Sequence, residues 1–399
     1  MKEFSYEEVE AATGGFAAKN LVGKGSHGSV YKARLWGWGG GRAAVVAVKR
    51  PSHAQGAAKL ANEIAVLSAA PRHPGVVAFV GVAAHQPAPA AASEGSRGVS
   101  APPPQLLLVM EYVPNGSLHD LLHRAPKPPP WPRRVEIALD VARAVQALHA
   151  AAPRVIIHRD VKSANVLLGR DGRARLADFS LAVRVAATAP KKAEDDEDED
   201  DDEGSAGPAP AGTIGYLDPC YTEPGRLGPE SDVFSFGVVL LELVSGRKVM
   251  DVNSCPSSIV AWAAPLIAGG RAREVLDPRV AAPRAARAEG AVARVLAVAA
   301  RCVSESVERR PPMAEVVSEL HGALESAGWR QRRRRGVVER ACRCVASWGQ
   351  RVGWSKRALR ATKIECTEHS DSGVALDREG SPCTLPPHPN NDTIGALIK

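Results

Sequence analysis

Four short motifs in a fixed order constrain the fold of this chain more than any other feature of its sequence. The first, residues 23–30, fits the pattern G-x-G-x-x-G-x-V and leads into a strand-like alternation at 30–35. Glycines in such a turn let the backbone fold tightly over phosphate groups, where side chains would collide. A Rossmann dinucleotide site is disfavoured, because it would need a helix directly after the glycines.

The second motif ends a buried strand in a cation. Residues 46–49 read Val-Ala-Val-Lys, so that Lys49 can offer its ammonium to phosphate oxygens. Glu63 lies fourteen residues further on, in a stretch of helical character at 57–67, where it can pair with Lys49 and hold it extended. Either residue alone would usually be structural or solvated, so a functional role for the pair depends on the other motifs.

The third and fourth motifs supply carboxylates and an amide. Residues 158–165 bring Asp160, Lys162 and Asn165 into one short loop, and Asp178 follows in Ala-Asp-Phe-Ser. Phosphoryl transfer needs cations that neutralise charge, oxygen ligands for Mg²⁺ and a carboxylate that orients the attacking hydroxyl. Because all four motifs occur in this order, we interpret them as one phosphoryl-transfer site.

With these motifs the chain resembles the eukaryotic protein kinases, and in particular the plant receptor-like cytoplasmic kinases. The resemblance covers about residues 4–325. It implies an α+β, bilobal protein-kinase fold with a small β-rich N-lobe and a larger helical C-lobe. The signatures of the plant group are FSYEEVEAAT at 4–13, MEYVPNGSL at 110–118, GTIGYLDP at 212–219 and SDVFSFG at 231–237, and those similar to its crinkly-related branch are LDPCYTEP at 217–224 and DVNS at 251–254.

The resemblance implies a kinase that uses ATP and Mg²⁺ to phosphorylate Ser or Thr of protein substrates, and itself, in intracellular signalling. Lys162, two residues after Asp160, is similar to the serine/threonine kinases rather than to the tyrosine kinases. Arg159 precedes Asp160, which resembles kinases that are activated by a phosphate on the activation segment, here 178–219.

Individual roles follow from the resemblance where the residues match. Asp160 would be the catalytic base, and Lys162 would neutralise the transferring phosphate. Lys49 with Glu63 would hold the α- and β-phosphates. The Mg²⁺ ligands would be Asn165 and Asp178, and the nucleotide would be bound by Val22, Gly23, Gly25, Gly28, Val30, Ala47, Lys49, Glu111 and Val113.

Three further positions have roles in the resemblance. Met110 would be the gatekeeper, followed by a hinge whose backbone contacts adenine. Asp232 would brace the catalytic loop from a buried helix, and Thr213 would line the pocket for the substrate residue.

Hydrophobic patterning agrees with two unlike halves. Strands are expected at 30–35, 43–49 and 106–113, joined by a hairpin at 36–42 and a flexible inserted loop at 86–104. Apolar stripes at helical spacing follow at 137–148, 292–303 and 313–324. The predicted divisions are a lead-in helix at 1–16 with Phe4, Val9 and Phe16 as apolar contacts, a kinase domain at 17–325, a basic amphipathic tail at 326–363 and a disordered tail at 364–399.

Two residues depart from the family pattern. The motif that begins at Asp178 usually has Gly as its third residue, and here that residue is Ser180. A Ser is expected to restrict the movement of this segment. Cys220 stands where the family usually has a Glu that pairs with a late Arg, so Arg310 is expected to be orphaned unless Glu223 substitutes.

An acidic run at 194–203 interrupts the activation segment. A solvated loop is the favoured interpretation. The alternatives are that its carboxylates imitate a phosphate near Arg159, attract a basic substrate, chelate Mg²⁺ or inhibit the enzyme. Ser205 and Thr213 are the nearest candidates for phosphorylation.

The net charge of +7 belongs to the end of the chain. Residues 330–363 hold twelve Lys or Arg against one Glu, whereas residues 1–329 are neutral overall, so nucleic-acid binding is disfavoured. The alternatives for this segment are a helix packed on the large lobe, an anionic membrane surface, a calmodulin-like partner or nuclear import through 332–335. Cys342 and Cys344 are candidates for palmitoylation.

Location is predicted from what the sequence lacks. The chain has no apolar run of the length of a membrane span and no secretory signal, and its seven Cys are an odd number without metal spacing. We therefore expect a cytoplasmic protein, with peripheral attachment to the plasma membrane as an option. The rival functions are a pseudokinase scaffold, which Ser180 and Cys220 favour, and an adaptor driven by the basic tail.

Overall fold

Six strands form the sheet of the N-terminal lobe. Their order is β1-β5-β6-β4-β3-β2, antiparallel except for the parallel pair of β1 and β5. The computed structural model describes residues 2–25, 28–36, 43–85, 105–186, 209–222 and 227–329. The strands are β1 (Lys2–Ser5), β2 (Leu21–Lys24), β3 (Gly28–Leu35), β4 (Ala44–Pro51), β5 (Phe79–His85) and β6 (Gln105–Glu111).

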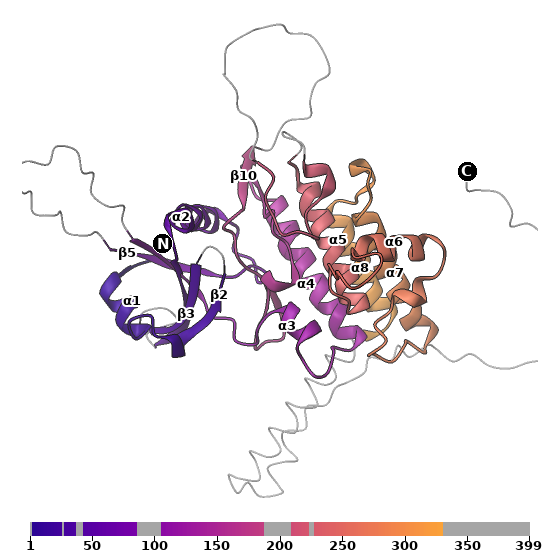
Figure 1. The fold of residues 1–399 in the computed structure, drawn as a ribbon, viewed down its shortest axis with the longest axis horizontal. Helices are drawn as coiled ribbons and strands as arrows, with labels where there is room; N and C mark the ends of the chain where they lie inside the picture. Colours follow the sequence, from indigo (N-terminus) through magenta and orange to yellow (C-terminus); the bar gives the residue numbers. More distant parts are fainter. Residues whose placement is uncertain are drawn as a thin grey trace, which may run out of the picture. The chain divides into compact units, whose positions relative to one another are not determined.

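Successive side chains of strand β4 point to opposite faces of the sheet. Val46 and Val48 pack into one core with helix α1 (Tyr6–Ala12). Ala47 belongs to a different core, which includes helix α2 (Ala54–Ala69). Side chains two residues apart share a face, so Lys49 follows Ala47 and is directed to α2. Both helices lie against the sheet (Figure 1).

The start of the chain differs from the expected lead-in helix. Phe4 and Val9 are buried as predicted, but Lys2–Ser5 form strand β1, and α1 begins only at Tyr6. The strand can form because Gly81 of β5 has no side chain: a Cβ there would lie 2.1 Å from the carbonyl oxygen of Lys2. Strand β1 thereby covers an edge of the sheet that would otherwise be unpaired.

Helices make up the second lobe, as the three apolar stripes predicted (Figure 1). The helices are α3 (Leu118–His123), α4 (Trp131–His149), α5 (Pro229–Ser245), α6 (Ile259–Ala268), α7 (Ala286–Cys302) and α8 (Met313–Ser326). Two small antiparallel ladders pair β7 (Arg154–Ile157) with β10 (Val183–Ala186) and β8 (Val166–Leu168) with β9 (Ala174–Leu176). The short 3-10 turns are η1 (Ala18–Asn20), η2 (Ser163–Asn165), η3 (Pro219–Thr222), η4 (Ala272–Val275) and η5 (Val307–Arg309).

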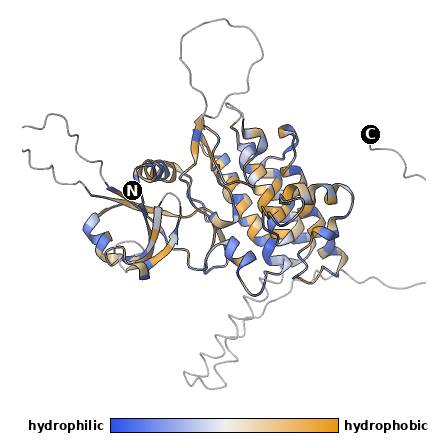
Figure 2. Cartoon of the chain, viewed as in Figure 1, coloured by the Kyte–Doolittle hydropathy of each residue, from blue (hydrophilic) through white to orange (hydrophobic). Residues whose placement is uncertain are grey.

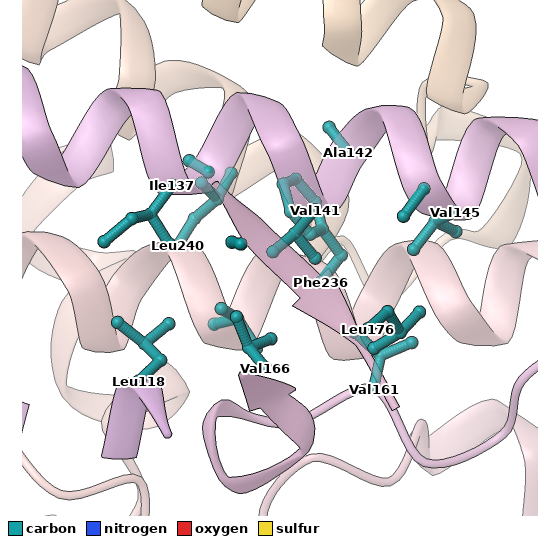
Figure 3. Packing of buried hydrophobic residues seen from close by; sticks show 14 of the residues in the cluster. Leu118, Ile137, Val141, Ala142, Val145, Val161, Val166, Leu176, Phe236 and Leu240 are labelled. Carbon is teal, nitrogen blue, oxygen red and sulfur yellow. The ribbon is translucent and has the colours of Figure 1, made fainter. Parts of the chain in front are cut away.

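Helix α5 is the centre of this lobe, because its residues from Ser231 to Ser245 are all buried. Figure 2 shows apolar residues gathered in the interior of the lobe and polar residues outside it. Figure 3 shows Val141 of α4 and Phe236 of α5 in the same apolar cluster. Gly237 lets α5 approach α7 closely, since a Cβ there would lie 2.6 Å from the Cβ of Cys302. Burial raises the pKa of the Cys302 thiol to about 12, so this thiol is neutral.

Several predicted segments lie outside the described residues: most of the hairpin at 36–42, the insert at 86–104, the acidic run at 194–203 with Ser205, Glu223, and both tails beyond 329. The described residues belong to one compact unit, residues 1–336. None of the helices in the described ranges has the length and apolar character that crossing a bilayer requires.

Candidate functional site

Lys49 joins three parts of the chain that are far apart in sequence. Its Nζ donates to Glu63 Oε2 of α2 at 2.6 Å and to Asp178 Oδ1 at 2.8 Å. Lys49 and Glu63 are both buried. Burial favours the neutral amine, but the two carboxylates outweigh it and raise the pKa of Lys49. The ammonium is therefore charged and held in place, as the spacing of Lys49 and Glu63 predicted.

The loop after β7 gathers polar groups around Asp160, which is 6% exposed. Its Oδ2 accepts from Lys162 Nζ at 2.7 Å and from Asn165 Nδ2 at 3.0 Å. Its Oδ1 accepts from Thr213 Oγ1 at 2.6 Å, and Lys162 also donates to Thr213 at 2.7 Å. Thr213 is fifty-three residues further along the chain, so the structure brings a distant segment to the loop.

Asp232 of α5 holds the same loop through its backbone. Its carboxylate accepts from the backbone N–H groups of His158 and Arg159, both at 2.8 Å, and lies 2.9 Å from His149 Nε2. Burial would raise the pKa of Asp232, but the hydrogen bond with His149 lowers it. Arg159 needs this support, because its backbone is left-handed with a φ of 66°.

The side chain of Arg159 contacts two segments that follow it in the chain, one at Leu181 and one at Ala209 and Tyr221. It donates to the carbonyl oxygen of Leu181 at 3.3 Å and to that of Ala209, and it stacks over the ring of Tyr221 at 5.5 Å. Its Nε–H is buried and has no hydrogen-bond partner in the described part of the chain. The alternative in which the acidic run at 194–203 contacts Arg159 concerns residues outside the described ranges.

Asp178 also has a left-handed backbone, with a φ of 65°. The next residue, Phe179, is fully buried edge-on to His158, with ring centroids 4.7 Å apart, and its N–H donates to Glu63 Oε1 at 3.1 Å. Burial would raise the pKa of Asp178, yet the ammonium of Lys49 lowers it well below its usual range. Asp178 is therefore ionised throughout the neutral pH range.

Ser180 has an ordinary backbone in this arrangement. Among the described residues other than Gly, only Phe16, Arg159 and Asp178 have positive φ, so Ser180 is not strained by its Cβ. Its carbonyl oxygen accepts from Asn62 Nδ2 of α2 at 3.2 Å, and that of Ala182 accepts from the same nitrogen at 2.9 Å. Asn62 thus joins the helix of Glu63 to the segment after Asp178, a contact that the sequence did not predict.

The glycine-rich motif lies on β2 and β3. Gly25 N donates to Gly28 O at 2.9 Å, and a Cβ on Gly28 would lie 2.5 Å from the carbonyl oxygen of Arg50, so only glycine fits at 28. Gly23 pairs with Val30 across the two strands. Val22 is an apolar side chain with 46% exposure, which suits the edge of an adenine site.

The segment after β6 is the predicted hinge. Met110 and Val113 are buried, and Met110 pairs with Ala47 across the strands. Glu111 donates its backbone N–H to Ala78 O at 2.9 Å, and its carboxylate is 2.5 Å from Arg175 Nε. The N–H of Glu111 is therefore already used inside the lobe and is not offered to a base.

Arg310 is not orphaned, which corrects the expectation from Cys220. Its guanidinium donates to both carboxylate oxygens of Asp218, at 2.5 and 2.9 Å. Asp218, two residues before Cys220, supplies the negative charge that was expected from a Glu at position 220 or from Glu223. The sulfur of Cys220 lies 3.6 Å from Arg310 Nη2 and adds a weak contact.

The donor set fits a hard divalent cation. Asn165 uses its Nδ2 for Asp160, and these bonds do not use its Oδ1. Asp178 adds an ionised carboxylate. Oxygen ligands of this kind, few in number, suit Mg²⁺ that is also bound by phosphates. Lys49, fixed between two carboxylates, can neutralise phosphate charge beside it.

Comparison with known proteins agrees with this geometry. The family model described as protein tyrosine and serine/threonine kinase matches residues 16–320. A serine/threonine-protein kinase-like protein of Arabidopsis thaliana is 42% identical over 340 residues, which cover 81% of this chain and 88% of the relative. A second Arabidopsis protein of the same description is 40% identical, over 82% of this chain and 81% of the relative. The nodulation receptor kinase of Pisum sativum is 35% identical over 81% of this chain and 31% of its own length.

Proposed function

The chain belongs to the family of protein tyrosine and serine/threonine kinases, and from this premise we propose that it is an active kinase that phosphorylates protein Ser and Thr residues. The observation that carries the proposal is the double contact of Lys49 with Glu63 and Asp178. An active kinase needs its strand Lys paired with the helix Glu and its metal-binding Asp in place at the same time.

The roles of the loop residues follow from their contacts. Asp160 accepts the proton of the substrate hydroxyl as the oxygen attacks, and Lys162 neutralises the negative charge on the oxygens of the phosphoryl group. ATP bound with Mg²⁺ supplies that group and part of the charge that balances it. Asn165 and Asp178 would hold the metal, and Lys49 would bind the α- and β-phosphates.

The nucleotide would lie between the two lobes. We propose that the backbone around Gly23, Gly25 and Gly28 covers the phosphates, where the lack of side chains leaves room. The adenine would contact apolar side chains and the hinge backbone. The apolar side chains would be those of Val22, Val30 and Ala47. The hinge backbone would be that of Glu111 and Val113, apart from the N–H of Glu111, which donates to Ala78 O.

Labelled phosphate tests the proposal directly. Purified full chain with ATP and Mg²⁺ is expected to incorporate phosphate into Ser and Thr, read by phospho-residue analysis, whereas Lys49→Met should incorporate none and remain folded by circular dichroism. Absence of label from the wild type, together with thermal stabilisation by ATP, would support the alternative of a pseudokinase scaffold. Label on Tyr alone would overturn the serine/threonine assignment.

Thr213 offers a finer test, because its hydroxyl joins Asp160 and Lys162. Thr213→Val keeps the shape of the side chain but leaves one Asp160 oxygen without its hydrogen bond, so kcat should fall about tenfold. Thr213→Ser keeps the hydroxyl and should stay within about twofold of the wild type. Steady-state kinetics on a Ser-containing peptide measure both, and equal loss in the two variants would contradict the hydrogen-bonding role.

The pseudokinase alternative rests on Ser180 and Cys220. Neither displaces a residue of the proposed site, since Ser180 has unstrained backbone and Asp218 replaces the missing charge near Cys220. We therefore favour catalysis.

The remaining assignments are also proposals. We propose that 17–325 is the kinase domain and that residues 178–219 are its activation segment. We propose that the protein is cytoplasmic and that it belongs to the crinkly-related branch. For residues 330–363 we propose peripheral attachment to a membrane or binding of a calmodulin-like partner. Retention of membrane binding after truncation at 329 would place the anchor elsewhere.

A further inference from the structure

Two histidines lie one turn apart on helix α3. His119 and His123 are separated by four residues, so their imidazoles lie on one face, with ring centroids 4.8 Å apart. The His119 imidazole makes no hydrogen bond with the part of the chain that the structure describes, and the residue is half-exposed. This leaves a nitrogen ligand with access to solvent beside a second, more buried one.

A buried carboxylate faces the same helix turn. Glu242 of α5 is 1% exposed, and its Oε1 lies 2.7 Å from His123 Nε2. The same oxygen accepts from Ser163 Oγ at 2.8 Å, and Oε2 accepts from Tyr216 OH at 2.7 Å. Glu242 has no Lys or Arg as an ion-pair partner within the described ranges, where its side-chain contacts are with His123, Ser163 and Tyr216.

We propose that His119, His123 and Glu242 form a binding site for a Zn²⁺ ion, separate from the proposed phosphoryl-transfer site. One ligand atom from each residue lies within 4.8 Å of the other two. Two imidazoles and a carboxylate are a ligand set that zinc uses, and a fourth position would be left for water. Histidines four residues apart on a helix are a recognised way to present two zinc ligands on one face.

The ligands reach a zinc ion by small movements. Zinc bonds of about 2.0 Å in tetrahedral geometry need donor atoms about 3.3 Å apart, somewhat closer than the present arrangement. The half-exposed His119 can turn inward, and His123 must turn its Nε2 from the carboxylate oxygen to the metal. Glu242 needs no movement, since α5 is buried along its length.

Asp120 between the two histidines is not a fourth ligand. Its Oδ2 accepts from the backbone N–H of Ser117 at 3.2 Å and from its hydroxyl at 2.7 Å, and these bonds cap the start of α3. The cap fixes the turn that carries the histidines. A zinc ion on Glu242 Oε1 would compete with the hydrogen bond from Ser163 Oγ. Ser163 belongs to the same loop as Asp160, so zinc binding would weaken one contact that holds this loop.

Zinc affinity of the full chain tests the site. Zn²⁺ is titrated against a chromophoric chelator, with Mg²⁺ in excess to occupy the oxygen ligands of Asn165 and Asp178. The wild type should bind one Zn²⁺ that His119→Gln and His123→Gln each weaken at least about tenfold. Co²⁺ in place of Zn²⁺ should give the intense visible bands of a four-coordinate ion, and His119→Gln should lose them.

His321→Gln is the matched control. His321 also lies one helix turn from a carboxylate, 3.4 Å from Glu325, but without a second imidazole, so its loss should leave the affinity unchanged. His119→Gln changes a half-exposed side chain and keeps all seven cysteines. Equal zinc affinity in the wild type and in a folded His119→Gln would therefore assign the bound metal to other ligands and overturn the proposal.

Discussion

Asp160→Asn is expected to lower the turnover of phosphate transfer by about a hundredfold or more while the protein stays folded. The amide has nearly the shape of the carboxylate and can keep the hydrogen bond from Thr213 Oγ1, which is 2.6 Å in the wild type. It cannot accept the proton of a substrate hydroxyl, and it no longer balances the charge of Lys162. The measurement is kcat on a Ser-containing peptide with saturating ATP and Mg²⁺.

Asp171→Asn is the control for this prediction, because Asp171 is an exposed carboxylate that pairs with Arg175 on the same lobe. It should keep the turnover of the wild type. Thermal stabilisation by ATP should persist in Asp160→Asn, since Lys49, the residue proposed to bind the α- and β-phosphates, is held by Glu63 and Asp178 and not by Asp160. Undiminished turnover in Asp160→Asn would remove this residue from the chemistry and leave the assignment of the loop without support.

Much of the site could be predicted because its residues lie in short local motifs. The residues of 158–165 reach each other within one loop, so the contacts of Asp160 with Lys162 and Asn165 need no knowledge of the fold. The pairing of Lys49 with Glu63 follows from a strand and a helix that are close in sequence. The strands at 30–35 and 43–49 and the three helical stripes were confirmed for the same reason, since each depends on its own periodicity.

The features that could not be predicted depend on contacts between distant segments. Strand β1 is four residues long and carries no strand pattern of its own; it exists because Gly81 lets the backbone of Lys2 approach. The left-handed backbone of Arg159 is stabilised by Asp232, which accepts from its N–H, and not by its own residue type. Asn62 carried no signal that separates it from any other polar residue on a helix.

Asp218 is the clearest of these cases, since the sequence pointed to a missing charge and not to its replacement. The family pattern has a Glu at the position of Cys220, so this position taken alone predicts an unpaired Arg310. The backbone turn at η3 instead presents Asp218, whose two oxygens match the two guanidinium nitrogens. The ion pair was recoverable only from the distance between two segments ninety-two residues apart.

Asp218→Ala should lower the free energy of unfolding by about 3–5 kcal/mol, because it leaves the charge of Arg310 buried without a counter-ion. The Arg310 side chain is fully buried, and within the described residues its only other polar partners are carbonyl oxygens, at Ser304 and Glu230, and the sulfur of Cys220. Chemical denaturation of the full chain, followed by tryptophan fluorescence, measures the change.

Cys220→Ala and a rescue variant separate the ion pair from simple loss of packing. Cys220→Ala removes a neutral contact to the same guanidinium at 3.6 Å, so it should cost less than about 1 kcal/mol. Adding Cys220→Glu to Asp218→Ala returns a carboxylate within reach of Arg310 and should recover part of the lost stability. If Asp218→Ala costs no more than Cys220→Ala, the pair does not stabilise the fold. The segment must then be held by other contacts, and those of the buried Tyr221 with Ala209 and Arg159 would be the first to test.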